Sequence, residues 1–424
     1  MWDSFFDVNW KSLIIGVGEM KKNVLWNTVG TIFYFFCQWI LTVIVVNMTN
    51  HDYEIAGYLA LAMTTSSSYS TIALFNMRSF QVSDVAGEFQ DGTYAGSRVI
   101  TCAVSFICCV IAAVVSGNSR YQILCILAYM GIRLVEAWVD VLQGMDQKYE
   151  RYDIIGKSYL IRGFLTVGLF VVGIRFFNSL IVALLLVFLS TAFVVIYYDG
   201  SLMKKINATF SVEMKKDVWI LLKKCFPFVI ISYLLSQENL LPKQMLQNLF
   251  GAEQQGIYST IAAPALIVQV CAAVVFSPFL PVFSKAYHEK NFDEFRNMLR
   301  KLYFVLIGMS VVVTLGAKLL GKWGLSLLYG KDILQNYNIF IPIVWVTILT
   351  AITWIFVAIM TAMRKIKTLL VGMLIDFGIC LLLMKPCIMT FEKNGVNLVQ
   401  IISLFLFIVY MIIICEIAVK QKKY

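Results

Sequence analysis

The sequence predicts an all-α integral membrane protein whose 12 transmembrane helices form two six-helix bundles, with both termini in the cytoplasm. Composition is the first reason: 60% of the 424 residues are hydrophobic, 14% are charged, and the mean hydropathy is +0.79. Soluble domains are about 45–50% apolar and about 25% charged. Apolar stretches long enough to cross a bilayer, which takes about 20 residues, recur along the chain. Basic residues gather on alternate connections between these stretches, as the positive-inside rule predicts.

Twelve apolar stretches define the predicted spans. They lie at about 24–46, 55–77, 99–116, 121–143, 154–174, 179–198, 226–247, 257–281, 301–320, 338–360, 366–386 and 398–418. The sixth and twelfth are almost pure hydrocarbon, whereas the second holds consecutive hydroxyl residues from Thr64 to Ser68. Small hydroxyls at this depth indicate either close helix packing or a water-lined cavity.

A basic segment midway along the chain sets the predicted domain organisation. We predict an N-terminal extension at 1–20, a first bundle at 21–200, a cytoplasmic basic amphipathic linker at 201–225 and a second bundle at 226–424. The extension is either an interfacial anchor or precedes a natural start at Met20, and the linker would lie along the inner leaflet. All seven prolines fall in the second half, where they introduce static kinks or hinges. Two six-helix halves around a central cavity are a common transporter plan.

The net charge of +10 has an ordinary explanation in a membrane protein. Cytoplasmic connections carry excess lysine and arginine, and these residues contact anionic lipid headgroups. We therefore expect anionic membrane lipids as partners and no nucleic acid. The predicted location is the bacterial cytoplasmic membrane, which the chain crosses many times.

Ionisable side chains inside the fourth span are the strongest functional signal. Arg133, Glu136 and Asp140 are spaced i, i+3, i+7 and share one face of a helix. Charges at membrane depth cost about 3 kcal/mol each and usually face an interior cavity. One interpretation is an Arg133–Glu136 pair that neutralises itself. The other is a polar cavity wall in which Arg133 meets an anionic substrate, and we favour it because Asp140 has no evident local partner.

Other spans contribute further polar residues. The fifth span adds Arg162, the eleventh adds Asp376, and Arg78 ends the second span, where it lines the cavity or snorkels to the interface. The seventh span places its polar side chains beside Pro242, where a proline break lets backbone and side chains line water together. The predicted substrate-binding residues are Arg78, Arg133, Arg162, Gln237, Lys243 and Gln244. The predicted ion-coupling residues are Glu136, Asp140, Glu238 and Asp376.

Enzymatic signatures are absent from the sequence. It has no GxxxxGK[ST] motif for ATP and only two histidines, so a metal site or a histidine-centred triad is not expected. The longest predicted external connection, at about 321–337, is too short for a catalytic surface. We predict a transporter, not an enzyme, and expect no cofactor. It would work by alternating access and be coupled to a proton or sodium gradient.

Three stretches resemble the Wzx-type polysaccharide flippases of the multidrug/oligosaccharidyl-lipid/polysaccharide (MOP, MATE-like) superfamily. They are Gly57–Ala60 with Asn76–Asp84; Glu136–Asp140 with Gln143–Gln147, Arg151, Asp153 and Arg162; and Pro242–Lys243 through Leu249–Gly251 to Gly256–Ser259.

This resemblance implies a MATE-like fold and a specific substrate. Such flippases move a polyprenyl-diphosphate-linked oligosaccharide from the cytoplasmic to the outer leaflet for O-antigen, capsule or exopolysaccharide assembly. The implied protein partners are a polysaccharide polymerase and other assembly proteins. The nearest alternative is a drug/metabolite cation antiporter of the same superfamily, which would share this topology. A membrane polysaccharide polymerase is a more distant alternative.

Overall fold

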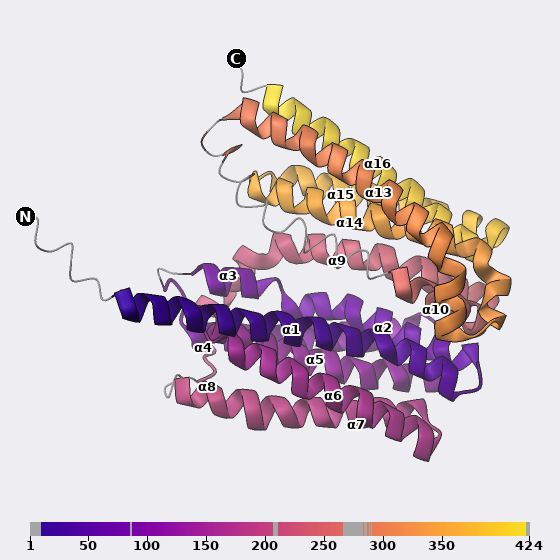
Figure 1. The fold of residues 1–424 in the computed structure, drawn as a ribbon, viewed down its shortest axis with the longest axis horizontal. Helices are drawn as coiled ribbons and strands as arrows, with labels where there is room; N and C mark the ends of the chain where they lie inside the picture. Colours follow the sequence, from indigo (N-terminus) through magenta and orange to yellow (C-terminus); the bar gives the residue numbers. More distant parts are fainter. Residues whose placement is uncertain are drawn as a thin grey trace, which may run out of the picture. The chain divides into compact units, whose positions relative to one another are not determined.

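Helices make up almost all of the computed structural model, which describes residues 10–84, 87–206, 211–265, 283, 286–287, 289 and 291–420. No strand occurs within these ranges. In chain order (Figure 1), the elements are α1 (Trp10–Met48), α2 (Tyr53–Leu74), α3 (Met77–Ser83), α4 (Asp91–Val115), α5 (Arg120–Lys148), α6 (Tyr152–Phe177), α7 (Leu180–Val194), η2 (Val195–Asp199), α8 (Gly200–Ile206), α9 (Lys216–Phe250), α10 (Ala252–Ala262), η3 (Ala263–Ala265), α13 (Phe292–Tyr329), η5 (Asp332–Ile339), α14 (Phe340–Ala362), α15 (Ile366–Phe391) and α16 (Lys393–Lys420).

The predicted membrane fold is confirmed. Ten helices in the described part of the chain are long and apolar enough to cross a membrane. The predicted second span is α2, a helix of 22 residues that contains the hydroxyl run. The predicted eighth span lies mostly outside the described residues, which include only its start in α10 and η3. The cytoplasmic location of the termini stays a prediction.

Two boundaries differ from the sequence-based expectation. α4 begins at Asp91, well before the predicted start at 99, because its first turns pack tightly on an extended segment. A Cβ atom on Gly96 would lie 1.9 Å from the carbonyl oxygen of Glu213. The predicted external connection at 321–337 is largely helical, since α13 continues to Tyr329 and η5 follows; Gly330, with φ 82°, ends α13.

The chain forms two compact units. The first contains residues 1–44 and 69–226, and the second contains residues 45–68 and 227–424. Residues 216–225 of the predicted linker form the first turns of α9, with Val218, Leu221 and Cys225 buried in the core of the first unit. In this unit α6 and α7 lie side by side, and both α4 and α7 pack on α5 (Figure 1).

The second unit has its own core, and it includes the hairpin at residues 45–68. Its core is built by α13, α14, α15 and α16, around side chains such as Phe295, Phe356 and Met411. The hairpin packs on α10 through glycines: a Cβ on Gly57 would lie 2.1 Å from the carbonyl oxygen of Ala252. Substitution at this contact would force the two backbones apart.

Candidate functional site: a buried arginine cluster in the first unit

A closed ring of hydrogen bonds joins α1 and α5 in the first unit. The Tyr34 hydroxyl donates to Glu136 and accepts from Gln38 Nε2 at 3.0 Å. The Tyr129 hydroxyl donates to Gln38 at 3.1 Å and accepts from Arg133 Nη2 at 3.4 Å. Arg133 Nη1 closes the ring by donating to Glu136 at 2.6 Å. The intrahelical pair considered from the sequence therefore forms, and it commits much of the Arg133 charge to Glu136.

Arg162 of α6 stands beside this ring but has a different environment. Its side chain is 1% exposed, and its guanidinium carbon lies 5.1 Å from the centre of the Tyr34 ring and 4.7 Å from that of Tyr159. These cation–π contacts hold the guanidinium in place. Nε and Nη2 are buried and have no hydrogen-bond partner among the described residues. Since buried donors are nearly always satisfied, these two nitrogens make Arg162 a candidate anion-binding residue.

A second ionic cluster surrounds Asp140, which corrects one premise of the sequence analysis. Asp140 does have partners: Arg98 Nη2 lies 2.8 Å from Oδ2, and Arg78 Nη1 lies 3.3 Å from Oδ1. Arg98, assigned from sequence to a connection, is fully buried in α4 and also donates to the Ala73 carbonyl. Asp140 therefore has a structural role as the counter-ion of a buried arginine.

Hydrogen bonds and a cation–π contact connect the Asp140 cluster to Arg162. Arg78 Nη1 donates to Gln143 Oε1 at 3.2 Å, and the Tyr159 hydroxyl donates to the same oxygen at 3.1 Å. Tyr159 is one of the two rings that contact Arg162. Five of the predicted residues thus belong to one continuous polar network in the first unit: Arg78, Arg133, Glu136, Asp140 and Arg162.

Asp84, which closes the first resembling stretch, has a local structural role. Its carboxylate accepts hydrogen bonds from the backbone N–H groups of Glu88 at 2.8 Å and Phe89 at 2.9 Å. Burial alone would raise the pKa of Asp84, but these bonds favour the charged form and hold its pKa below the usual value. Asp84 therefore fixes the turn that leads into α4.

The second unit contains a separate pair of buried acids. Glu238 of α9 and Asp376 of α15 are 4% and 3% exposed, and their carboxyl groups lie close enough to interact with each other. Ser403 Oγ of α16 donates to Glu238 at 2.7 Å. Two neighbouring buried carboxyl groups do not both ionise readily, and one shared proton relieves their repulsion. The pair can therefore hold a proton, or exchange it for another cation.

The other predicted residues of α9 lie in polar surroundings of the second unit. Gln237 donates to Ser68, a member of the hydroxyl run, at 2.9 Å. Lys243 donates to Asn239 at 2.5 Å, and Gln244 is buried. The hydroxyl run thus supplies a packing contact to α9 within the second unit.

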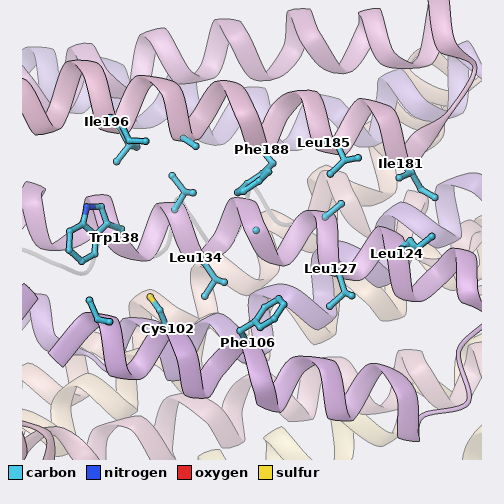
Figure 2. Close-up of a pocket in the computed structure, with 16 residues that line it drawn as sticks. Cys102, Phe106, Leu124, Leu127, Leu134, Trp138, Ile181, Leu185, Phe188 and Ile196 are labelled. Atoms are coloured by element: carbon cyan, nitrogen blue, oxygen red, sulfur yellow. The ribbon is translucent and has the colours of Figure 1, made fainter. Parts of the chain in front are cut away.

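An apolar groove of about 730 Å³ lies on the first unit between α4, α5 and α7 (Figure 2). Its 16 lining residues carry no charge and include Phe106, Leu124, Trp138 and Phe188. From Leu124 to Trp138 the helix rises about 21 Å, most of the thickness of a bilayer core. Such a groove suits a hydrocarbon chain and offers nothing to a phosphate.

The chain is similar to several known proteins. No family model matches the chain. It is 28% identical over 330 residues to the capsular polysaccharide biosynthesis protein CapF of Staphylococcus aureus. The aligned region covers 76% of this chain and 80% of CapF. It is similar to the lipid II flippase MurJ in an inward closed conformation, with a TM-score of 0.72, 14% identity and coverage of 93% and 87%.

A multidrug resistance MATE family transporter of the MOP superfamily in an inward-facing conformation also matches, with a TM-score of 0.63, 10% identity and coverage of 95% and 99%. The chain shares the fold of these solved structures. The MATE-like fold predicted from the resemblance is therefore confirmed.

Sequence reasoning missed several members of this polar network. Tyr34, Gln38 and Tyr159 lie within apolar spans, where an aromatic or a single amide does not stand out from lipid-facing or core residues. Arg98 was assigned to a connection because the start of its span was placed too late. Spacing would have helped with Tyr34 and Gln38, which are i, i+4 and share a helix face.

Proposed function

We propose that this protein flips a polyprenyl-diphosphate-linked oligosaccharide from the cytoplasmic to the outer leaflet of a bacterial cytoplasmic membrane, for the assembly of a surface polysaccharide. The observation that carries the proposal is Arg162, a buried guanidinium with two unpartnered nitrogens. The relationship to CapF, named for capsular polysaccharide biosynthesis, supports the substrate class.

The chemistry of a lipid diphosphate fits the first unit in two ways. A diphosphate needs fixed cationic donors, and arginine binds phosphate oxygens with two parallel N–H donors. Arg162 offers Nε and Nη2, the edge that such a bidentate contact uses. The polyprenyl tail needs only apolar surface, and the groove lined by Leu124 and Phe188 supplies it.

Ion coupling is assigned to the acid pair of the second unit. Glu238 and Asp376 are the only predicted coupling residues whose carboxyl groups interact with each other in the described part of the chain. Exchange of their shared proton for solvent protons or Na⁺ would supply the driving force. Glu136 and Asp140 remain sequence-based candidates, but each already neutralises an arginine.

The experiment that tests this function is a deletion of the gene in its host. The proposal predicts accumulation of lipid-linked oligosaccharide on the cytoplasmic side and loss of surface polymer. Plasmid-borne wild-type protein should restore the polymer, whereas Arg162→Ala should not, although it is expressed at a similar level. Arg175→Ala, an exposed arginine on the same helix, is the matched control and should restore the polymer.

The rival function is a drug/metabolite cation antiporter, which the match to a multidrug transporter keeps open. If this were the function, deletion of the gene would leave the surface polymer normal and would lower resistance to cationic drugs. An unpartnered arginine is unfavourable for a cationic substrate, so the first unit favours the flippase. Polymer chains that fail to grow, with repeat units already on the outer leaflet, would instead indicate a polymerase.

A further inference from the structure

The first unit contains two buried aspartates, near Arg162, that have no role in the proposed function. Asp146 belongs to the last turns of α5, and Asp199 is the last residue of η2. Each is 2% exposed. η2 is a five-residue π-helix, a local departure from α-helix that often marks a functional site.

The two carboxyl groups have an incomplete set of partners. Ser158 Oγ of α6 donates to Asp199 Oδ2 at 2.9 Å. Oδ1 of Asp199 and Oδ1 of Asp146 are both buried, and neither has a hydrogen-bond partner among the described residues. α5 packs on η2, and the two negative charges repel each other. Ionising both acids in this setting is unfavourable, because burial and the repulsion between the two carboxylates both oppose it.

The cations around the pair are already committed, with one exception. The Asp146 carboxyl interacts electrostatically with two cations, Arg151 and Arg78, and with the carboxyl of Asp153. However, Arg151 is paired with Asp153 at 2.9 Å, and Arg78 is paired with Asp140. That bond to Asp153 raises the pKa of Arg151, so Arg151 stays charged and paired.

The exception is Arg162. Its positive charge attracts the Asp199 carboxylate, which also interacts with the Tyr198 phenol. On α6, Arg162 follows Ser158, the hydrogen-bond donor to Asp199, by one helical turn. The charge of Arg162 also acts on Glu136, but Glu136 is already paired with Arg133. Arg162 can therefore serve either the aspartate pair or a bound anion.

We propose that Asp146 and Asp199 bind one proton between them, and that this proton controls how strongly Arg162 binds the diphosphate of the substrate. The inference rests on the proposed function. With the proton bound, the pair carries a single negative charge and leaves Arg162 to the anion. Without it, the second carboxylate competes for the same guanidinium. Because such coupling is reciprocal, anion binding must draw a proton onto the pair.

The donor set favours a proton over a metal ion. The pair offers two carboxyl groups and one hydroxyl, and no group of three metal-ligating side chains occurs in the described ranges. This proton site differs from the Glu238–Asp376 pair, which belongs to the second unit.

The test uses the full-length protein in detergent with farnesyl diphosphate, a short polyprenyl diphosphate, as the probe. Calorimetric titration in two buffers of different ionisation heat gives the number of protons taken up on binding. Wild type should take up a proton, and its affinity should fall about tenfold between about pH 6 and about pH 8. Asp199→Asn and Asp146→Asn, which imitate the protonated acids, should bind without proton uptake and at constant affinity.

Glu416→Gln is the matched control, since Glu416 is a paired carboxylate of the second unit. It should keep the wild-type proton uptake. Wild-type binding without proton uptake, or unchanged uptake in both asparagine variants, would overturn the inference while leaving the proposed function intact. Failure of the probe to bind, or equal binding by wild type and Arg162→Ala, would contradict the proposed function and the inference together. A thermal melt of each variant verifies folding.

Discussion

The ion triad of Arg78, Arg98 and Asp140 allows a stability prediction with a worked magnitude. Asp140→Asn keeps the side-chain volume but leaves the Arg98 charge, on a fully buried side chain, without a counter-ion. Removing one partner of a buried ion pair costs about 3–5 kcal/mol. The Arg78 side chain is 31% exposed and makes a longer contact, and a pair of that kind contributes about 0–1 kcal/mol.

The assay is the apparent Tm of the purified protein in detergent. Asp140→Asn should lower it on the order of 5–10 °C, whereas the control Arg78→Met should lower it by a small part of that. Adding Arg98→Met to Asp140→Asn should recover most of the loss, because the unpaired charge is then gone. Equal losses from Asp140→Asn and Arg78→Met, or no recovery in the double variant, would refute the reasoning.

Three further predictions follow from individual contacts. Gly57→Val should abolish folded expression, measured by size-exclusion profile, because its side chain would overlap the Ala252 carbonyl; Gly168→Val, in open space, should be tolerated. Tyr34→Phe removes the hydroxyl that joins Glu136 to Gln38 and should lower the apparent Tm by a few degrees, from a loss of about 1–3 kcal/mol; an unchanged Tm would show that the ring contributes nothing. Glu238→Gln should make transport in proteoliposomes insensitive to an imposed pH or Na⁺ gradient while substrate binding persists; transport that still responds to the gradient would remove Glu238 from the coupling site.

Hydropathy was sufficient to predict the helices because the bilayer demands long apolar segments whatever their tertiary contacts. It could not predict where α4 begins, since that boundary depends on the packing of Gly96 against a residue more than one hundred positions away. Nor could it place residues 45–68 with the second unit, because that grouping depends on contacts between distant segments.

The candidate site was predictable where a charge interrupts an apolar span and not otherwise. Arg133, Glu136 and Arg162 were found this way, and the structure brings them around Tyr34. The sequence could not rank the two arginines, since only the structure distinguishes a guanidinium committed to a carboxylate from one without a partner. Asp146 and Asp199 were missed for a related reason: near the end of a span, a carboxylate is typical of a connection.

The most direct test of the central claim is lipid flipping in proteoliposomes. Purified protein would be reconstituted with a fluorescent polyprenyl-diphosphate sugar, and a membrane-impermeant quencher would report the fraction in the outer leaflet over time. We predict transfer by wild type and by Arg175→Ala, and at least tenfold slower transfer by Arg162→Ala, as expected when a charged hydrogen bond of about 1.5–3 kcal/mol is lost. Transfer by Arg162→Ala at the wild-type rate would contradict the account.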